Sequence, residues 1–191
     1  ELGGVNMQNL VDQTCRFTGH RQLSEEIVID LQRSLEKEIV QMMHAGFAVF
    51  VRGGRGFDML AESTVLRIKQ DYPQVRLEII VPFRGQAKNW TKREQVQYDS
   101  ILQKADRVVC LSERYDRGCM QVRNRYLGNQ SSKCICYLEK NTGGTKYTVD
   151  YALSKNLQVI NLQIAPVCSK MAASSLLSAA NMHDMNINIC L

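Results

Sequence analysis

The chain has 191 residues, a formal net charge of +5, 45% hydrophobic residues and 23% charged residues. This length suits one domain, and the composition excludes a disordered or fibrous chain. No apolar run approaches the roughly 20 residues of a membrane span, and residues 1–13 lack the basic-then-apolar pattern of a secretory signal, so we expect a cytoplasmic protein with no membrane partner.

Short apolar runs alternate with helical patterns along the chain. The expected strands are residues 14–18, 47–51, 75–81, 107–111, 132–138 and 158–162. The expected helices are residues 24–45, 57–71, 91–104, 119–129 and 145–155. This alternation predicts a parallel sheet with right-handed crossovers. Ligands of such sheets bind at the carboxyl ends of the strands.

The alternation ends near Pro166. Residues 171–180 are rich in Ala, Ser and Leu and favour a short helix, whereas the rest of this segment has no clear periodicity. We therefore expect one domain over residues 1–165 and a tail over residues 166–191.

The first expected strand ends at Thr18-Gly19-His20-Arg21. A hydroxyl, a glycine and two potential cations leave the strand together, at the place where α/β proteins bind ligands. These residues can contact a phosphate or a base edge. The alternative is an ordinary turn with a surface arginine.

The second expected strand runs into a glycine-rich corner, Gly53-Gly54 and Gly56, before a helix that starts near Asp58. A strand, a glycine turn and a helix aim backbone N–H groups at an anion, most often a phosphate. Tight turns also require glycine for steric reasons alone, and the spacing matches neither a P-loop nor the dinucleotide fingerprint. Asp58 and Glu62 share one helix face and can act as ribose ligands, as general bases or as first-turn acids.

Aromatic and basic residues follow the third and fourth expected strands. Trp90, the single tryptophan, lies in a polar loop and either stacks on a nucleobase or anchors the core. Tyr115, Arg117 and Gly118 lie between the fourth strand and the next helix, and Arg123 lies near the start of that helix. Guanidinium groups suit phosphate oxygens, and the alternative is a solvated basic face.

A second glycine corner, Gly143-Gly144-Thr145, follows the fifth expected strand and opens a helix. Each corner supplies backbone donors to the same edge of the sheet. Two such corners strengthen the expectation of a phosphate-binding crevice.

Seven cysteines and three histidines are scattered without a C-x-x-C pair. Cys15, Cys110, Cys134 and Cys136 lie in apolar strand-like runs, where cysteine acts as a small hydrophobic residue. We expect reduced, structural cysteines and no metal site.

Together these motifs resemble the YpsA-like branch of the SLOG superfamily, which also contains the DNA-processing protein DprA and the LOG phosphoribohydrolases. The resemblance covers about residues 14–162. It implies an α/β, Rossmann-like three-layer fold with a mostly parallel central sheet and helices on both faces. It also implies a crevice for a nucleotide or a nucleotide-derived ligand such as ADP-ribose. Arg52 and Arg55 depart from the branch, where small or apolar residues are common.

The expected ligand-binding residues are Thr18, Gly19, His20, Arg21, Gly53, Gly54, Gly56, Asp58, Trp90, Tyr115, Arg117, Gly118, Arg123, Asn124, Gly143, Gly144 and Thr145. They predict a cytoplasmic binding protein or sensor for an ADP-ribose-like or NAD-like ligand or a nucleoside phosphate. One alternative is a LOG-like N-glycosidase acting on nucleoside monophosphates, with Glu62 or Asp150 as its catalytic carboxylate. Another is DprA-like binding of single-stranded DNA. The sequence leaves catalytic turnover, a tightly bound cofactor and homo-oligomerisation open.

Overall fold

The computed structural model describes residues 7–162. The helices of this range are α1 Met7–Asp12, α2 Glu25–His44, α3 Phe57–Ile68, α4 Lys92–Lys104, α5 Cys119–Asn129 and α6 Gly143–Ser154. The strands are β1 Thr14–Gly19, β2 Val49–Arg52, β3 Arg76–Val81, β4 Arg107–Cys110, β5 Lys133–Tyr137 and β6 Gln158–Asn161.

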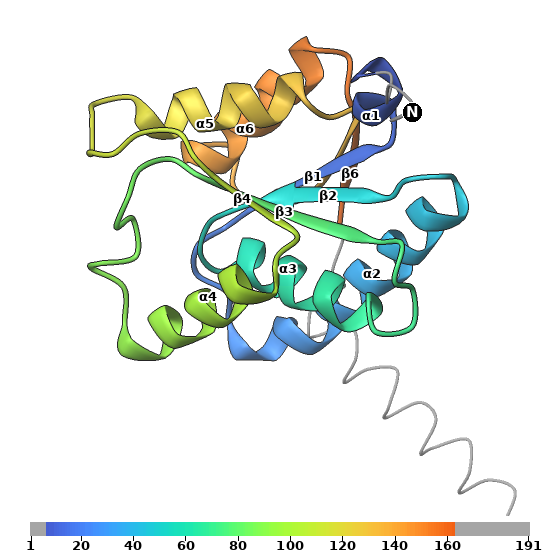
Figure 1. Ribbon diagram of the computed structural model, residues 1–191, viewed down its shortest axis with the longest axis horizontal. Coiled ribbons are helices and arrows are strands. Elements are labelled where there is room, and N and C mark those ends of the chain that lie inside the picture. Colours follow the sequence, from blue (N-terminus) through green and yellow to red (C-terminus); the bar gives the residue numbers. More distant parts are fainter. Residues whose placement is uncertain (1–6, 163–191) are drawn as a thin grey trace, which may run out of the picture.

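The strands form one parallel sheet in the order β4-β3-β2-β1-β5-β6. From β1 the chain winds outward to β4, then crosses back and places β5 on the free side of β1. Helices α2, α3 and α4 cover one face, and α1, α5 and α6 cover the other (Figure 1). The predicted Rossmann-like three-layer fold is confirmed. Its winding direction changes between β1 and β5, which is where open α/β sheets form a binding crevice.

Helix α2 shows how the apolar pattern becomes packing. Its buried side chains repeat at the helical period and face the sheet: Leu31, Leu35, Ile39 and Met42. On the same side of the sheet, the rings of Phe17 and Phe50 stack with their centroids 5.8 Å apart. This core fixes β1 and β2, the two strands that lead into Thr18-Gly19-His20-Arg21 and the first glycine corner.

The second strand begins two residues later than predicted. The backbone N–H of Phe47 donates to the carbonyl of Met42 at 3.0 Å, and that of Ala48 donates to the carbonyl of Gln13 at 3.2 Å. These bonds hold Phe47 and Ala48 in the turn after α2, so the ladder starts only at Val49. Phe47 is nevertheless buried in the core, as its apolar side chain predicts.

Other differences lie at element ends and edges. Helix α3 ends at Ile68 rather than at residue 71, and α6 begins at Gly143 rather than at residue 145. Helix α1 is absent from the sequence-based prediction. Cys110 is exposed, not buried as its apolar run predicts, because β4 is an edge strand. The predicted tail and its helix at residues 171–180 lie outside the described residues.

Three further observations concern the described part of the chain. Between residues 7 and 162, no helix combines the length and the apolarity needed to cross a membrane. In the same range, no group of three or more His, Cys, Asp or Glu side chains is arranged to hold a metal ion. Its five cysteines are free thiols. Burial raises the pKa of Cys136 to about 12, so this thiol stays protonated at neutral pH.

Candidate functional site

A cavity of about 660 Å³ opens at the carboxyl ends of β1 and β2, between the beginnings of α3, α5 and α6. Its size is within the range of small-molecule sites. All of the predicted ligand-binding residues except His20 and Gly56 line it. The long loops that follow β3 and β4 project together at the left of Figure 1 and carry further lining residues, including Trp90 and Tyr115. We call this cavity the crevice.

The first glycine corner is shaped by close backbone packing. A Cβ atom on Gly53 would lie 2.6 Å from the carbonyl oxygen of Ile80, and one on Gly56 would lie 2.3 Å from that of Arg21. The backbone N–H of Phe57 donates to the carbonyl of His20 at 3.1 Å. Glycine is therefore required at these two positions by the neighbouring chain, whatever the crevice binds.

The second glycine corner has open space around it. A Cβ atom on Gly143 or on Gly144 would meet no other atom within 4 Å. The hydroxyl of Thr145 donates to the carbonyl of Gly19 at 3.0 Å, which fixes the start of α6 to the end of β1. The side chain of Thr142, the residue before α6, makes no capping hydrogen bond. The first turn of α6 thus has the uncapped N–H groups and the open approach that an anion needs.

Buried hydrogen bonds connect the two corners through α5. The Arg123 guanidinium donates through Nη1 to the carbonyl of Gly53 and through Nε to Oδ1 of Asn124, the latter at 3.0 Å. Nδ2 of Asn124 donates to the hydroxyl of Thr148 at 2.9 Å, and this hydroxyl donates to the carbonyl of Gly144 at 2.8 Å. Arg123 and Asn124 line the crevice, but they also form the frame that sets the spacing of its corners.

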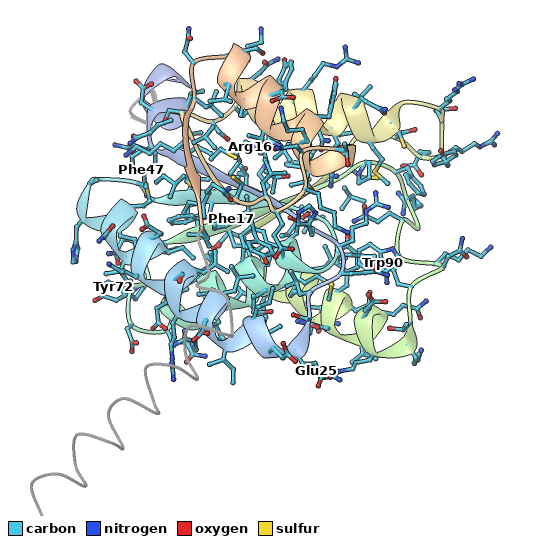
Figure 2. All side chains as sticks on the ribbon, turned by 180° about the vertical axis from the view of Figure 1, so that it is seen from behind. Arg16, Phe17, Glu25, Phe47, Tyr72 and Trp90 are labelled. Atoms are coloured by element: carbon cyan, nitrogen blue, oxygen red, sulfur yellow. The ribbon has the colours of Figure 1, made fainter. Side chains whose placement is uncertain are left out.

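Arg16, on the central strand β1, supports this frame through α5. No sequence motif predicted a role for it. Adjacent residues of a strand face opposite sides of the sheet, and Figure 2 shows Arg16 on the α6 side and Phe17 on the α2 side. Nη1 of the fully buried Arg16 donates to the carbonyl of Asn124 at 3.0 Å. A cation therefore fastens α5 to the central strand.

The charged side chains that line the crevice are mostly cationic. Four arginines line it, namely Arg21, Arg55, Arg117 and Arg123, against one acidic residue, Asp58, and Arg55 is ion-paired with Glu94. Arg21 and Arg117 are exposed, and neither forms an ion pair with any described residue. Asp58 is only 2% exposed, at the start of α3. This charge balance favours an anionic ligand.

Several predicted site residues lie elsewhere. Nε2 of His20 accepts hydrogen bonds from the backbone N–H groups of Glu139 and Lys140 at 2.9 and 3.4 Å, so His20 joins two loops beside the crevice. Glu62 is fully buried one turn deeper in α3 than Asp58, and it does not line the crevice. Asp150 is exposed and forms an ion pair with Lys146.

The sequence interpretation also missed part of the lining. Tyr147 and Thr148 line the crevice one turn into α6, and Met120 and Gln121 do so in the first turn of α5. These residues could have been predicted from the expected helix starts, because the side chains of a first turn lie near any ligand bound at the helix N-terminus. Arg55 was noted in the sequence only as an unusual residue of the first corner.

Trp90 lies between the core and the crevice. Its ring packs against the core, with its centroid 5.0 Å from that of the Tyr98 ring, and it also lines the crevice. Burial raises the pKa of Tyr98 well above that of a free phenol, so this residue is neutral. Its hydroxyl accepts a hydrogen bond from Nε2 of Gln86 at 2.5 Å. Stacking of a base near Trp90 remains a prediction.

Residues 19–167 match the sequence model described as the YspA SLOG family. A UPF0398 protein of Brevibacillus brevis is 28% identical over 129 residues, which are 65% of this chain and 69% of the relative. A UPF0398 protein of Halalkalibacterium halodurans is 27% identical over 132 residues, which are 67% of this chain and 70% of the relative. The resemblance predicted from the motifs is confirmed.

Two solved structures have a similar fold. DNA processing protein A from Helicobacter pylori, which binds single-stranded DNA, matches with a TM-score of 0.57 and 14% identity over 84% of this chain and 69% of its own. DNA processing protein A from Streptococcus pneumoniae matches with a TM-score of 0.60 and 16% identity over 85% of this chain and 54% of its own. The chain thus spans about half of the second protein, and these likenesses establish a shared fold.

Proposed function

This chain belongs to the YspA SLOG family, and we propose that it is a cytoplasmic protein that binds a nucleotide-derived ligand in the crevice. The ligand class is an ADP-ribose-like or NAD-like molecule or a nucleoside phosphate. The free thiols of the described cysteines support the location, since a reducing compartment keeps thiols reduced.

One observation carries this proposal: both glycine corners open into the same arginine-rich cavity. Gly53 and Gly54 come from one side of β1, and Gly143 and Gly144 come from the other. Backbone donors, a helix N-terminus and exposed guanidinium groups are the groups that proteins use to hold phosphate. The aromatic residues of the same lining suit a base.

Binding without turnover is the better-supported form of this function. An N-glycosidase needs a carboxylate beside the ribose to stabilise an oxocarbenium-like state. Neither Glu62 nor Asp150, the two carboxylates predicted for this role, lines the crevice, so Asp58 is the single lining carboxylate left to perform it. Released base on incubation with AMP or NAD would contradict this preference.

A thermal-shift screen with substitution of Gly144 tests the proposal. We expect at least one of ADP-ribose, NAD, AMP and ATP to raise the unfolding temperature of the full chain, because a ligand of the native state stabilises it by about 2.7 kcal/mol at 100 times its Kd. Gly144→Leu fills the open space in front of α6. It should abolish the shift, while the unliganded protein gains up to about 1 kcal/mol from a better helix former.

Ser154→Leu, at the exposed far end of the same helix, serves as the matched control and should leave the ligand shift unchanged. A shift that survives in Gly144→Leu would place the ligand outside the crevice. No shift with any of the four compounds would contradict the proposed function.

Single-stranded DNA is the second candidate ligand. The fold likeness to a protein that binds it is joined here by three exposed arginines, Arg114, Arg117 and Arg125, of which Arg117 lines the crevice. If this candidate holds, the affinity for a labelled oligonucleotide should fall steeply with added salt, as phosphate contacts release counterions. Absence of binding at about 50 mM salt, where such contacts are strong, excludes it.

A further inference from the structure

One wall of the crevice carries an arginine whose charge is already paired. Nε and Nη2 of Arg55 donate to the same oxygen, Oε1 of Glu94, at 2.9 and 2.6 Å. The central guanidinium carbon of Arg55 also lies 5.7 Å from the centre of the Trp90 ring. Because Glu94 compensates its charge, Arg55 attracts phosphate less strongly than an unpaired arginine does. Its side chain is one-third exposed, at 33%, and a planar guanidinium is a good surface for stacking.

The wall behind Arg55 is held rigidly. Oε2 of Glu94 accepts hydrogen bonds from the backbone N–H and the hydroxyl of Thr91, each at 2.8 Å, and completes a capping box at the start of α4. Burial alone would raise the pKa of Glu94, but bonds from the backbone of Thr91 and from the side chains of Arg55 and Thr91 together lower it, so the carboxylate is ionised at neutral pH. Nε2 of Gln95 donates to the carbonyls of Ala87, Lys88 and Trp90.

The other part of the lining has the opposite character. Arg21 and Arg117 are exposed and form no ion pair within the described chain, and Thr142 makes no side-chain hydrogen bond to cap the first turn of α6. The crevice therefore joins a region of uncompensated positive charge to a wall of low net charge that carries the planar groups of Arg55 and Trp90. A nucleotide has the same two parts, a phosphate and an uncharged planar base.

From this division of charge we propose that Arg55 and Trp90 form the base subsite of the crevice, while Arg21, Arg117 and the start of α6 hold phosphate. The inference rests on the proposed function and assigns an orientation to its ligand. Glu94 is a positioning residue, since it holds the Arg55 plane against the Trp90 ring. Gln86, which lines the crevice beside this wall, supplies an amide for the edge of the base.

The single tryptophan of the chain makes this subsite directly observable. The full chain is titrated with AMP, with ADP-ribose and with ribose 5-phosphate, which lacks the base, and calorimetric affinity and Trp90 emission are measured in parallel. We expect AMP to bind about tenfold more tightly than ribose 5-phosphate, as one stacked base typically adds. Only the two base-bearing compounds should change the emission of Trp90.

Arg55→Lys retains a cation opposite Glu94 but removes the planar guanidinium group on which a base would stack. It should lower the affinity for AMP about tenfold, leave the affinity for ribose 5-phosphate unchanged, and leave thermal unfolding of the unliganded protein unchanged. Arg21→Ala is the control for the phosphate side and should weaken the binding of AMP and of ribose 5-phosphate alike.

If AMP binds without changing the Trp90 emission, or if Arg55→Lys weakens the binding of both compounds equally, the base subsite is wrong and the proposed function stands. If none of the three compounds binds, the base subsite is wrong, and the proposed function is wrong as well when NAD and ATP also fail to raise the unfolding temperature.

Discussion

Gly56→Ala should lower the free energy of unfolding by roughly 4 kcal/mol, because steric overlap adds to backbone strain. Gly56 has φ 64° and ψ −117°, a conformation essentially restricted to glycine. Its new Cβ atom would lie 2.3 Å from the carbonyl oxygen of Arg21 and 2.6 Å from that of His20. Both contacts are to backbone, so no side-chain rotation relieves them. Urea denaturation followed by circular dichroism measures the loss.

Gly46→Ala is the matched control for this substitution. Gly46 also has a positive φ, of 88°, just after α2, but a Cβ atom there would meet nothing within 4 Å. Backbone strain alone should cost about 1–2 kcal/mol. A loss in Gly56→Ala no larger than the loss in Gly46→Ala would show that the first corner moves away from the His20 loop without penalty, and that the close packing does not define the crevice.

The order and type of the predicted elements are confirmed because each βα unit has local boundary signals. Both ends of helix α5 were predicted correctly, because a glycine, Gly118, precedes it and an apolar strand follows it. In the structure Gly118 is the N-cap residue and has φ 97°. Helix α1 escaped prediction because its 6 residues are too few to show an amphipathic stripe. The exposure of Cys110 could not be predicted either, because an apolar run does not reveal which strand lies at the edge of the sheet.

The sequence predicted which loops surround the crevice, but it did not predict what most of the individual side chains in those loops contact. The rule that ligands bind at the carboxyl ends of parallel strands brought most of the predicted residues together. Roles depend on contacts between distant parts of the chain. The bond between His20 and Glu139 spans 119 residues, and the bond between Arg123 and Gly53 spans 70 residues. No local spacing encodes such pairs, so residues predicted as ligand contacts proved to hold loops together.

Arg123→Ala should destabilise the unliganded protein by about 3 kcal/mol, because it leaves buried acceptors without donors and opens a cavity. Arg123 is only 5% exposed, and its guanidinium donates to the carbonyl of Gly53 and to Oδ1 of Asn124. Arg123→Lys should recover part of this loss, since an ammonium keeps the charge but lacks the fork that reaches both acceptors. Equilibrium denaturation without any nucleotide measures all of these variants.

Arg125→Ala is the matched control that separates a structural role of Arg123 from a role in ligand binding. Arg125 lies on the same helix but is exposed, and its loss should change the stability by less than about 0.5 kcal/mol. A residue that served only the ligand would, when replaced, weaken binding and leave the unliganded stability unchanged. If Arg123→Ala behaves like Arg125→Ala in denaturation, the clamp on the first corner is wrong and Arg123 acts on the ligand alone. If it is destabilised as expected, the first corner depends on α5, and the spacing of the two glycine corners is set inside the protein before any ligand arrives.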